Sequence, residues 1–216
     1  CADPVSGVTV MGRIHIALLG SALVLMFTAN ANAAFDLDKV MRDMADRFVR
    51  PAYSGFSDKA NRLEVAQKQL CDAPSQANAS AAKTAFADAA LAWAHVESFR
   101  AGPVIQENRL ERVLFYPDRK GTGLKQVQAT LAASDESAAD AAALAGKSVA
   151  MQGLGALEFV LFGTGSDGLE TTVGNFRCRY GAAIAENVSD IASALTAAWA
   201  SGGPVDLDWN SHHEAN

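Results

Sequence analysis

The sequence predicts an all-α protein built as an up-and-down helical bundle. About one residue in five is alanine, which is the best helix former and a poor strand former. Apolar residues recur at spacings of three, four and seven, the period of a helix that buries one face. No alternation of apolar and polar residues is long enough to indicate a strand. Helices joined by short breaks pack most simply as a bundle.

The composition fits a folded domain without a nucleic-acid partner. The chain has 216 residues, of which 50% are hydrophobic and 19% charged, so it can form one domain or two small ones around a buried core. The formal net charge is −6 and no cluster of Lys and Arg stands out. Both observations argue against binding to DNA or RNA.

The N-terminal region has the layout of a secretory signal peptide. Residues 1–10 are an upstream extension of doubtful status, and residues 11–33 contain Arg13, an apolar run over 14–27 and a small-residue cleavage site before Ala34. We expect cleavage there, a periplasmic location, and contact with the membrane only through the uncleaved segment. A membrane anchor is the alternative, although the apolar run is short for a span.

Two helices are expected in the first half of the mature chain. The first covers about 36–70, and Pro51 should kink or split it. The second covers about 75–100 and ends before Gly102-Pro103. The apolar positions of the first helix are Val40, Met44, Phe48, Phe56, Leu63, Ala66 and Leu70.

The second half is also expected to be helical. One apolar stripe follows the helical period through the last helix, at Tyr180, Ile184, Val188, Ile191, Leu195 and Trp199. In order, the expected segments are an irregular stretch over 104–123, helices over 124–133 and 135–162, a loop over 163–168, the last helix over 175–199 and a polar tail over 201–216.

Two cysteines, Cys71 and Cys178, lie in the mature part of the chain. Export to an oxidising compartment favours a disulfide between them, and two unrelated buried thiols are the alternative. No CxxC motif is present, so the sequence indicates neither a redox motif nor a zinc knuckle.

One candidate site lies at the end of the second expected helix. Trp93, Glu97 and Arg100 are spaced four and three residues apart, which would place them on one helix face. Arg100 would hold an anion or a carboxylate, Trp93 would form a wall, and Glu97 would extend the polar patch. A simple ion pair between Glu97 and Arg100 is the alternative.

A second candidate site lies in the apolar stretch over 151–163. Glu158 must face water there, be paired, or have a raised pKa. Gly153 and Gly155 are costly inside a helix unless the helix breaks or another group approaches closely. We interpret this stretch as a broken helix with a buried acid, in which Glu158 accepts a hydrogen bond or binds a ligand. Gln152 and Asp118 are further candidate members of the polar site.

Four segments, taken in order, resemble the imelysin-like family and specifically its periplasmic, predicted-lipoprotein branch. They are WAHVESFRAGP, FYPD, the stretch from Gln152 to Gly163, and FRCRYGAAIAENV. That family was once classed as M75 metallopeptidases and is associated with bacterial iron uptake. The resemblance implies two similar four-helix bundles with a site between them, and a bridge between Cys71 and Cys178. Full family domains are longer, so we expect a C-terminally truncated domain over 34–200, with one four-helix bundle and part of a second.

The chain departs from the family signature GxHxxE at one position. Gly153 and Glu158 match, but Gly155 occupies the place of the histidine. One carboxylate is a poor transition-metal site, and a zinc peptidase needs three protein ligands. We therefore expect a non-enzymatic periplasmic protein linked to iron uptake through a bound metal ion, small ligand or partner protein.

The resemblance names candidates for what this protein binds. Iron or another divalent metal is the candidate cofactor, with Glu158 as its ligand, and iron-uptake components of the cell envelope are the candidate partners. A metal-dependent peptidase and a truncated remnant without a ligand are the two alternative functions.

Overall fold

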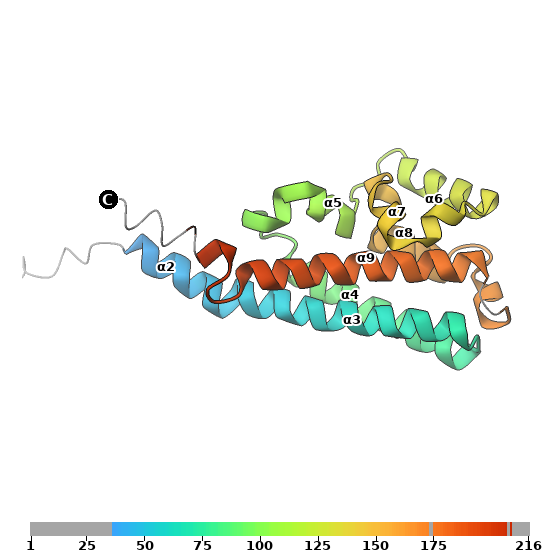
Figure 1. Cartoon of the computed structure of the whole chain (residues 1–216), viewed down its shortest axis with the longest axis horizontal. Coiled ribbons are helices and arrows are strands. Elements are labelled where there is room, and N and C mark those ends of the chain that lie inside the picture. Colours follow the sequence, from blue (N-terminus) through green and yellow to red (C-terminus); the bar gives the residue numbers. More distant parts are fainter. Residues whose placement is uncertain (1–35, 173–174, 207, 209–216) are drawn as a thin grey trace, which may run out of the picture. The chain divides into compact units, whose positions relative to one another are not determined.

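The computed structural model describes residues 36–172, 175–206 and 208, and every regular element in this part of the chain is helical (Figure 1). The predicted all-α fold is confirmed. The upstream extension, the signal peptide and most of the polar tail lie outside the described residues. The chain forms two compact units, 1–41 and 42–216. No helix in the described ranges is long and apolar enough to span a membrane.

Four helices of the second unit form the predicted bundle. They are α3 (Arg50–Asp72), α4 (Gln76–Val96), α8 (Leu154–Phe162) and α9 (Phe176–Trp199). The long helix α3 packs along both α4 and α9, and the short helix α8 contacts the same two helices (Figure 1). The core lies between them, where the whole predicted stripe of α9 is buried.

The first predicted helix is not split at Pro51, because the backbone stays helical on both sides of it. Helix α2 (Leu37–Met44) runs into a π-helical turn over Ala45–Val49, and α3 continues directly from Arg50, next to the proline. The wider turn shifts the helix face, and Phe48 within it is 42% exposed instead of joining the core. Val40, in the first unit, is 46% exposed. The buried stripe of α3 begins only after this turn.

Helix α4 begins as its sequence indicates but ends early. The Ser75 side chain accepts a hydrogen bond from the Asn78 N–H (3.2 Å) and caps the first turn. The helix ends at Val96, because the chain then folds across the end of α9. There the Phe99 ring packs edge-on against Trp199, with centroids 5.5 Å apart, and Gly102 has φ +66° close to the same indole.

The long helix predicted over 135–162 is wrong. The chain forms four short helices there, because the side chains of Asp135 and Asp140 each accept a backbone N–H bond that starts a new turn, and because Gly153 interrupts the last stretch. They are η3 (Glu136–Ala139), α7 (Ala141–Ala145), η4 (Val149–Met151) and α8.

The remaining connections are close to the prediction. The irregular stretch over 104–123 contains a 3-10 helix, η2 (Gly102–Asn108), and a short helix, α5 (Arg109–Val113). Helix α6 (Thr122–Ala133) follows nearly where expected, and the loop after α8 contains a 3-10 helix, η5 (Ser166–Glu170).

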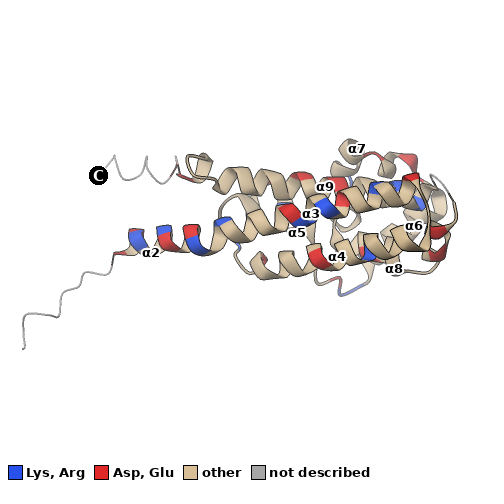
Figure 2. Cartoon of the chain, turned by 90° about the horizontal axis from the view of Figure 1, so that it is seen from below, with Lys and Arg blue, Asp and Glu red and all other residues tan. Residues whose placement is uncertain are grey.

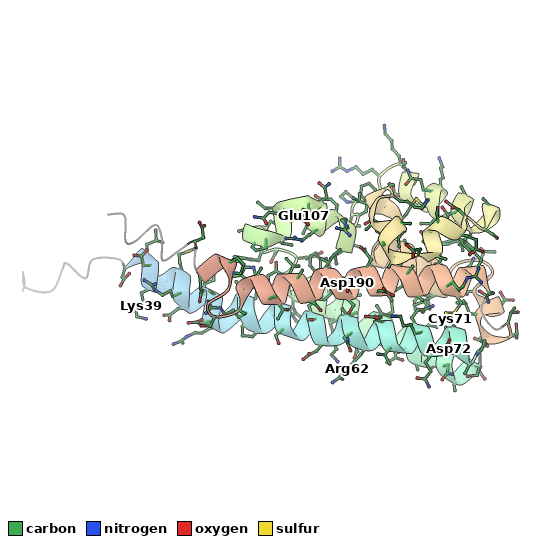
Figure 3. The ribbon with its side chains drawn as sticks, viewed as in Figure 1. Lys39, Arg62, Cys71, Asp72, Glu107 and Asp190 are labelled. Carbon is green, nitrogen blue, oxygen red and sulfur yellow. A yellow bond between two sulfur atoms is a disulfide. The ribbon has the colours of Figure 1, made fainter. Side chains whose placement is uncertain are left out.

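A disulfide joins Cys71 at the end of α3 to Cys178 in the first turn of α9 (Figure 3). The predicted pairing is confirmed, and the alternative of two separate thiols is wrong. Next to the bridge, the buried Gln67 side chain donates a hydrogen bond to the Cys178 carbonyl (3.4 Å). A Cβ atom at Gly181 would lie 2.7 Å from that amide nitrogen, so α9 approaches α3 closely at this end of the bundle.

Candidate functional site

A pocket of about 530 Å³ lies on the side of α8 that faces away from the bundle core, and we call it the α8 pocket. Its walls come from the segment after α5, from α6, from η4 and from α8. The lining residues are Leu114, Phe115, Tyr116, Asp118, Gly123, Leu124, Val127, Val149, Ala150, Gly153, Gly155, Ala156, Glu158, Phe159, Phe162 and Gly163.

Helix α8 is apolar on nearly all sides, and its two faces have different roles. One face carries Leu157, Val160 and Leu161, which are fully buried in the bundle. The opposite face carries residues 155, 158, 159 and 162, which the helical period places side by side along the pocket. The sequence of α8 therefore supplies both a core face and a face that lines the pocket.

Gly153 allows the pocket wall to form. A Cβ atom at this position would lie 2.4 Å from the Val113 carbonyl oxygen and 2.5 Å from that of Arg112. The end of α5 thus rests directly on the backbone at the start of α8, and the chain continues from there into Leu114 and Phe115 of the pocket. Both reasons foreseen for this glycine, a helix break and a close approach, are confirmed.

Gly155 is different, because the space above it is open. A Cβ atom there would meet only the Leu114 side chain, at 4.0 Å. This is an ordinary van der Waals contact, so the absent side chain leaves free volume in the α8 pocket.

A buried polar network holds the start of α8 in place. The Arg112 guanidinium donates from Nε to Gln152 Oε1 (2.8 Å) and from Nη2 to Asn187 Oδ1 (2.6 Å). Asn187 Nδ2 donates to the Gln152 carbonyl (2.9 Å), and Gln152 Nε2 donates to the Lys147 carbonyl (2.6 Å). Gln152 does not line the pocket. Its amide is engaged by Arg112 and Lys147, so it holds the start of α8 in place.

The Tyr180 hydroxyl adds a further tie to the same segment. It donates to the Met151 carbonyl (2.8 Å), and burial raises the pKa of this phenol. Sequence reasoning missed Arg112 and Asn187. The one available signal was the position of Asn187, a polar residue within the apolar stripe of α9.

The carboxylate of Asp118 organises the opposite wall. It accepts hydrogen bonds from the backbone N–H groups of Thr122 (2.8 Å) and Leu124 (3.1 Å), which belong to the first turn of α6. Asp118, a candidate from the sequence, lies in the lining of the pocket, with both oxygens bonded to the helix that forms the wall.

Arg177 completes α8 at its other end. Its guanidinium donates to the carbonyls of Phe159 (3.1 Å) and Val160 (3.0 Å) in the last turn of α8 and to that of Thr164 (2.5 Å) in the loop that follows. Burial lowers the pKa of this guanidinium. The group also lies 5.5 Å from the centroid of the Phe159 ring, so it fixes a wall of the pocket.

The predicted buried acid is wrong, because Glu158 is exposed at the pocket. It lies three residues after Gly155 on the face of α8 that lines the pocket. It makes no hydrogen bond or ion pair with any residue that the structure describes. Its carboxylate is therefore available to a ligand.

The other predicted site does not form. The sequence predicts that Trp93, Glu97 and Arg100 share one helix face. Because the helix ends at Val96, Arg100 does not lie on that face. Trp93 is buried in the core against Phe56, with ring centroids 5.1 Å apart. Arg100 is exposed, and none of these three candidates lines the α8 pocket. Figure 2 shows acidic and basic residues interspersed along the described helices.

The donor set of the α8 pocket does not fit a transition-metal ion. Within the described ranges, no three His, Cys, Asp or Glu side chains come together as metal ligands would. Of the two carboxylates in the lining, that of Asp118 is engaged by backbone N–H groups, and Gly155 offers no side-chain donor. Glu158 alone is too few ligands for iron or zinc.

Comparison with known proteins assigns the family. The sequence profile of the family described as Imelysin, peptidase M75, matches residues 49–214. The chain belongs to the imelysin family. A search of curated proteins found no match.

The fold of this imelysin-family chain is similar to the crystal structure of an imelysin-like protein from Psychrobacter arcticum 273-4. The TM-score is 0.66 and the sequence identity 21%, over 74% of this chain. The chain spans about half the length of that protein, since the match covers 49% of it.

The α8 pocket gathers the three positions at which the sequence was compared with the family signature. Gly153, Gly155 and Glu158 all line it. The pocket therefore holds the Glu158 carboxylate and has no imidazole at residue 155.

Proposed function

We propose that this imelysin-family chain is a non-enzymatic binding protein of the periplasm that serves iron uptake and binds a small ligand in the α8 pocket. The observation that carries the proposal is the gathering of the signature positions around a pocket of about 530 Å³. This volume is in the usual range for sites of small molecules. Family membership supports the link to iron uptake and to envelope partners.

Peptidase activity is the weaker alternative. Hydrolysis by a zinc enzyme needs three protein ligands and an open position, and the donor set described above falls short of that number. His95 lies exposed on α4 and does not line the pocket. The function that this arrangement supports best is therefore binding.

A pair of glycine substitutions tests the proposal. Gly155→Leu fills the open space in the α8 pocket, and Gly55→Leu is the matched control, because Gly55 is also an exposed helical glycine with nothing within 4 Å of a Cβ atom. Thermal shift against a library of small molecules should find ligands that stabilise the wild type and Gly55→Leu but not Gly155→Leu. Ligands that stabilise all three proteins equally would place binding elsewhere.

The same variants test the biological role. In a host strain that lacks the gene and grows under iron limitation, the wild type and Gly55→Leu should restore growth, and Gly155→Leu should not. Restoration by Gly155→Leu would contradict the role of the pocket in iron uptake. Casein cleavage that a chelator abolishes and that Glu158→Ala removes would favour the peptidase instead.

A further inference from the structure

We propose that the ligand of the α8 pocket is a small organic cation, an apolar body that carries an ammonium or similar group. This inference rests on the proposed function and names the chemical class of the ligand. It follows from the side chains that meet at the pocket, taken as one set.

The ionisable groups of the lining are of one sign. Among the described residues they are the carboxylates of Glu158 and Asp118 and the phenol of Tyr116. Asp118 already accepts two backbone hydrogen bonds. Glu158 accepts none from the residues that the structure describes, so its exposed carboxylate is the one open to pairing with a ligand.

The rest of the lining is apolar and rich in aromatic rings. Phe115, Tyr116, Phe159 and Phe162 contribute four rings, and Tyr116 is 80% exposed at the mouth. The faces of such rings attract cations, particularly where water is displaced. Cations of the protein already lie over two of the rings, with Lys83 Nζ 5.8 Å from the Phe162 centroid and the Arg177 guanidinium 5.5 Å from that of Phe159.

These two features together select the charge of the ligand. An apolar ligand that fills the pocket would cover Glu158, and a carboxylate removed from water without a donor is strongly unfavourable. An anionic ligand would add repulsion from the same group. A cation pairs with Glu158 and gains further attraction from the rings, so it is the class that fits both.

Cations around the pocket do not replace the ligand. Lys83 and Arg177 are positioned over single rings, and Arg177 is engaged with backbone carbonyls. Arg119 and Lys120 follow Asp118 in an exposed turn and are not part of the lining. None of these four residues forms an ion pair with Glu158 in the described part of the chain.

Three probes of similar size test the inference, namely 2-phenylethylammonium, 2-phenylethanol and phenylacetate. Each is titrated into the full chain and followed by the backbone amide signals of α8 in NMR spectra. The cation should bind about tenfold more tightly than the alcohol, the size of effect expected for a charge-assisted contact, and the acid should bind least. Glu158→Gln should remove this preference, while Glu97→Gln, a conservative change outside the pocket, should leave it intact.

The outcomes separate this inference from the proposed function. Equal affinities for the cation and the alcohol, with shifts at α8 that Gly155→Leu abolishes, would overturn the cation while leaving the pocket as the binding site. A preference for the cation that survives Glu158→Gln would also overturn the inference. A cationic probe that leaves the α8 amides unchanged would overturn the cation, and the proposed function would then depend on the library screen with Gly155→Leu.

Discussion

Two glycines that lie two residues apart in the signature should respond oppositely to the same substitution. Gly153→Ala adds a methyl group at a position where the Cβ atom would lie 2.4 and 2.5 Å from two backbone carbonyl oxygens. Gly155→Ala adds the same group where the only neighbour is a flexible side chain at 4.0 Å. The pair therefore separates steric constraint from the intrinsic preference of the helix.

The expected magnitudes follow from these distances. Relief of the clash at residue 153 requires the backbone of α5 to move, so overpacking should cost about 3 kcal/mol, the upper end of the usual range. Alanine in place of an unconstrained helical glycine should stabilise by about 0.5 to 1 kcal/mol, through helix propensity and a smaller loss of chain entropy. For a chain of this size, the melting temperature should fall by about 6 to 12 °C in the first variant and rise by about 1 to 4 °C in the second.

Urea unfolding followed by circular dichroism measures both changes directly. The midpoint should decrease for Gly153→Ala and increase slightly for Gly155→Ala, with an unchanged slope, because neither variant alters the surface exposed on unfolding. If Gly153→Ala were as stable as the wild type, the close contact between α5 and the start of α8 would be wrong. Destabilisation by Gly155→Ala would contradict the open space above Gly155 in the pocket.

Two further predictions concern the bundle. The bridge between Cys71 and Cys178 joins residues 107 positions apart in the sequence. Replacing both cysteines by serine should therefore lower the free energy of unfolding by about 4 to 5 kcal/mol in the chain-entropy model. A loss below 1 kcal/mol in urea titrations would refute that reasoning. Burial raises the pKa of Tyr53 from 10.0 to about 12. The stabilisation from burying the neutral phenol is therefore complete below pH 10 and is lost as the pH rises from 10 to about 12. The total loss should be about 2 to 3 kcal/mol. Urea midpoints at pH 8 and pH 12 check this, and Tyr53→Phe should lose less stability over the same interval; an equal loss would exclude Tyr53 as its source.

The long helices were predictable because each buries one face, so apolar residues recur in its sequence with the helical period. Helix α9 shows this most clearly, since all six positions of its predicted stripe are buried. The stretch over 135–162 was not predictable by the same means. Its alanines favour a helix, but Asp135 and Asp140 compete with helix continuation through local hydrogen bonds, and periodicity does not record that competition.

The candidate site was predictable only in part. Glu158 and Asp118 line the pocket, because the break at Gly153 has a local signal in the sequence. Arg100 was misplaced because the end of α4 depends on a contact with Trp199, about 100 positions further along the chain. Trp93 was misplaced because its face of α4 packs into the core against Phe56. Arg112 had no signal at all, since its partners Gln152 and Asn187 are brought to it only by the folded bundle.

The open space above Gly155 also makes it possible to measure what a single side chain at this position contributes to metal binding. A histidine installed at this position would share a helix face with Glu158 and meet no neighbouring backbone. Gly155→His would thus add, in a single step, the histidine that the resemblance to the family leads one to expect there. Whatever metal affinity the substituted chain gains over its parent can be credited to that one ring, in a scaffold otherwise unaltered.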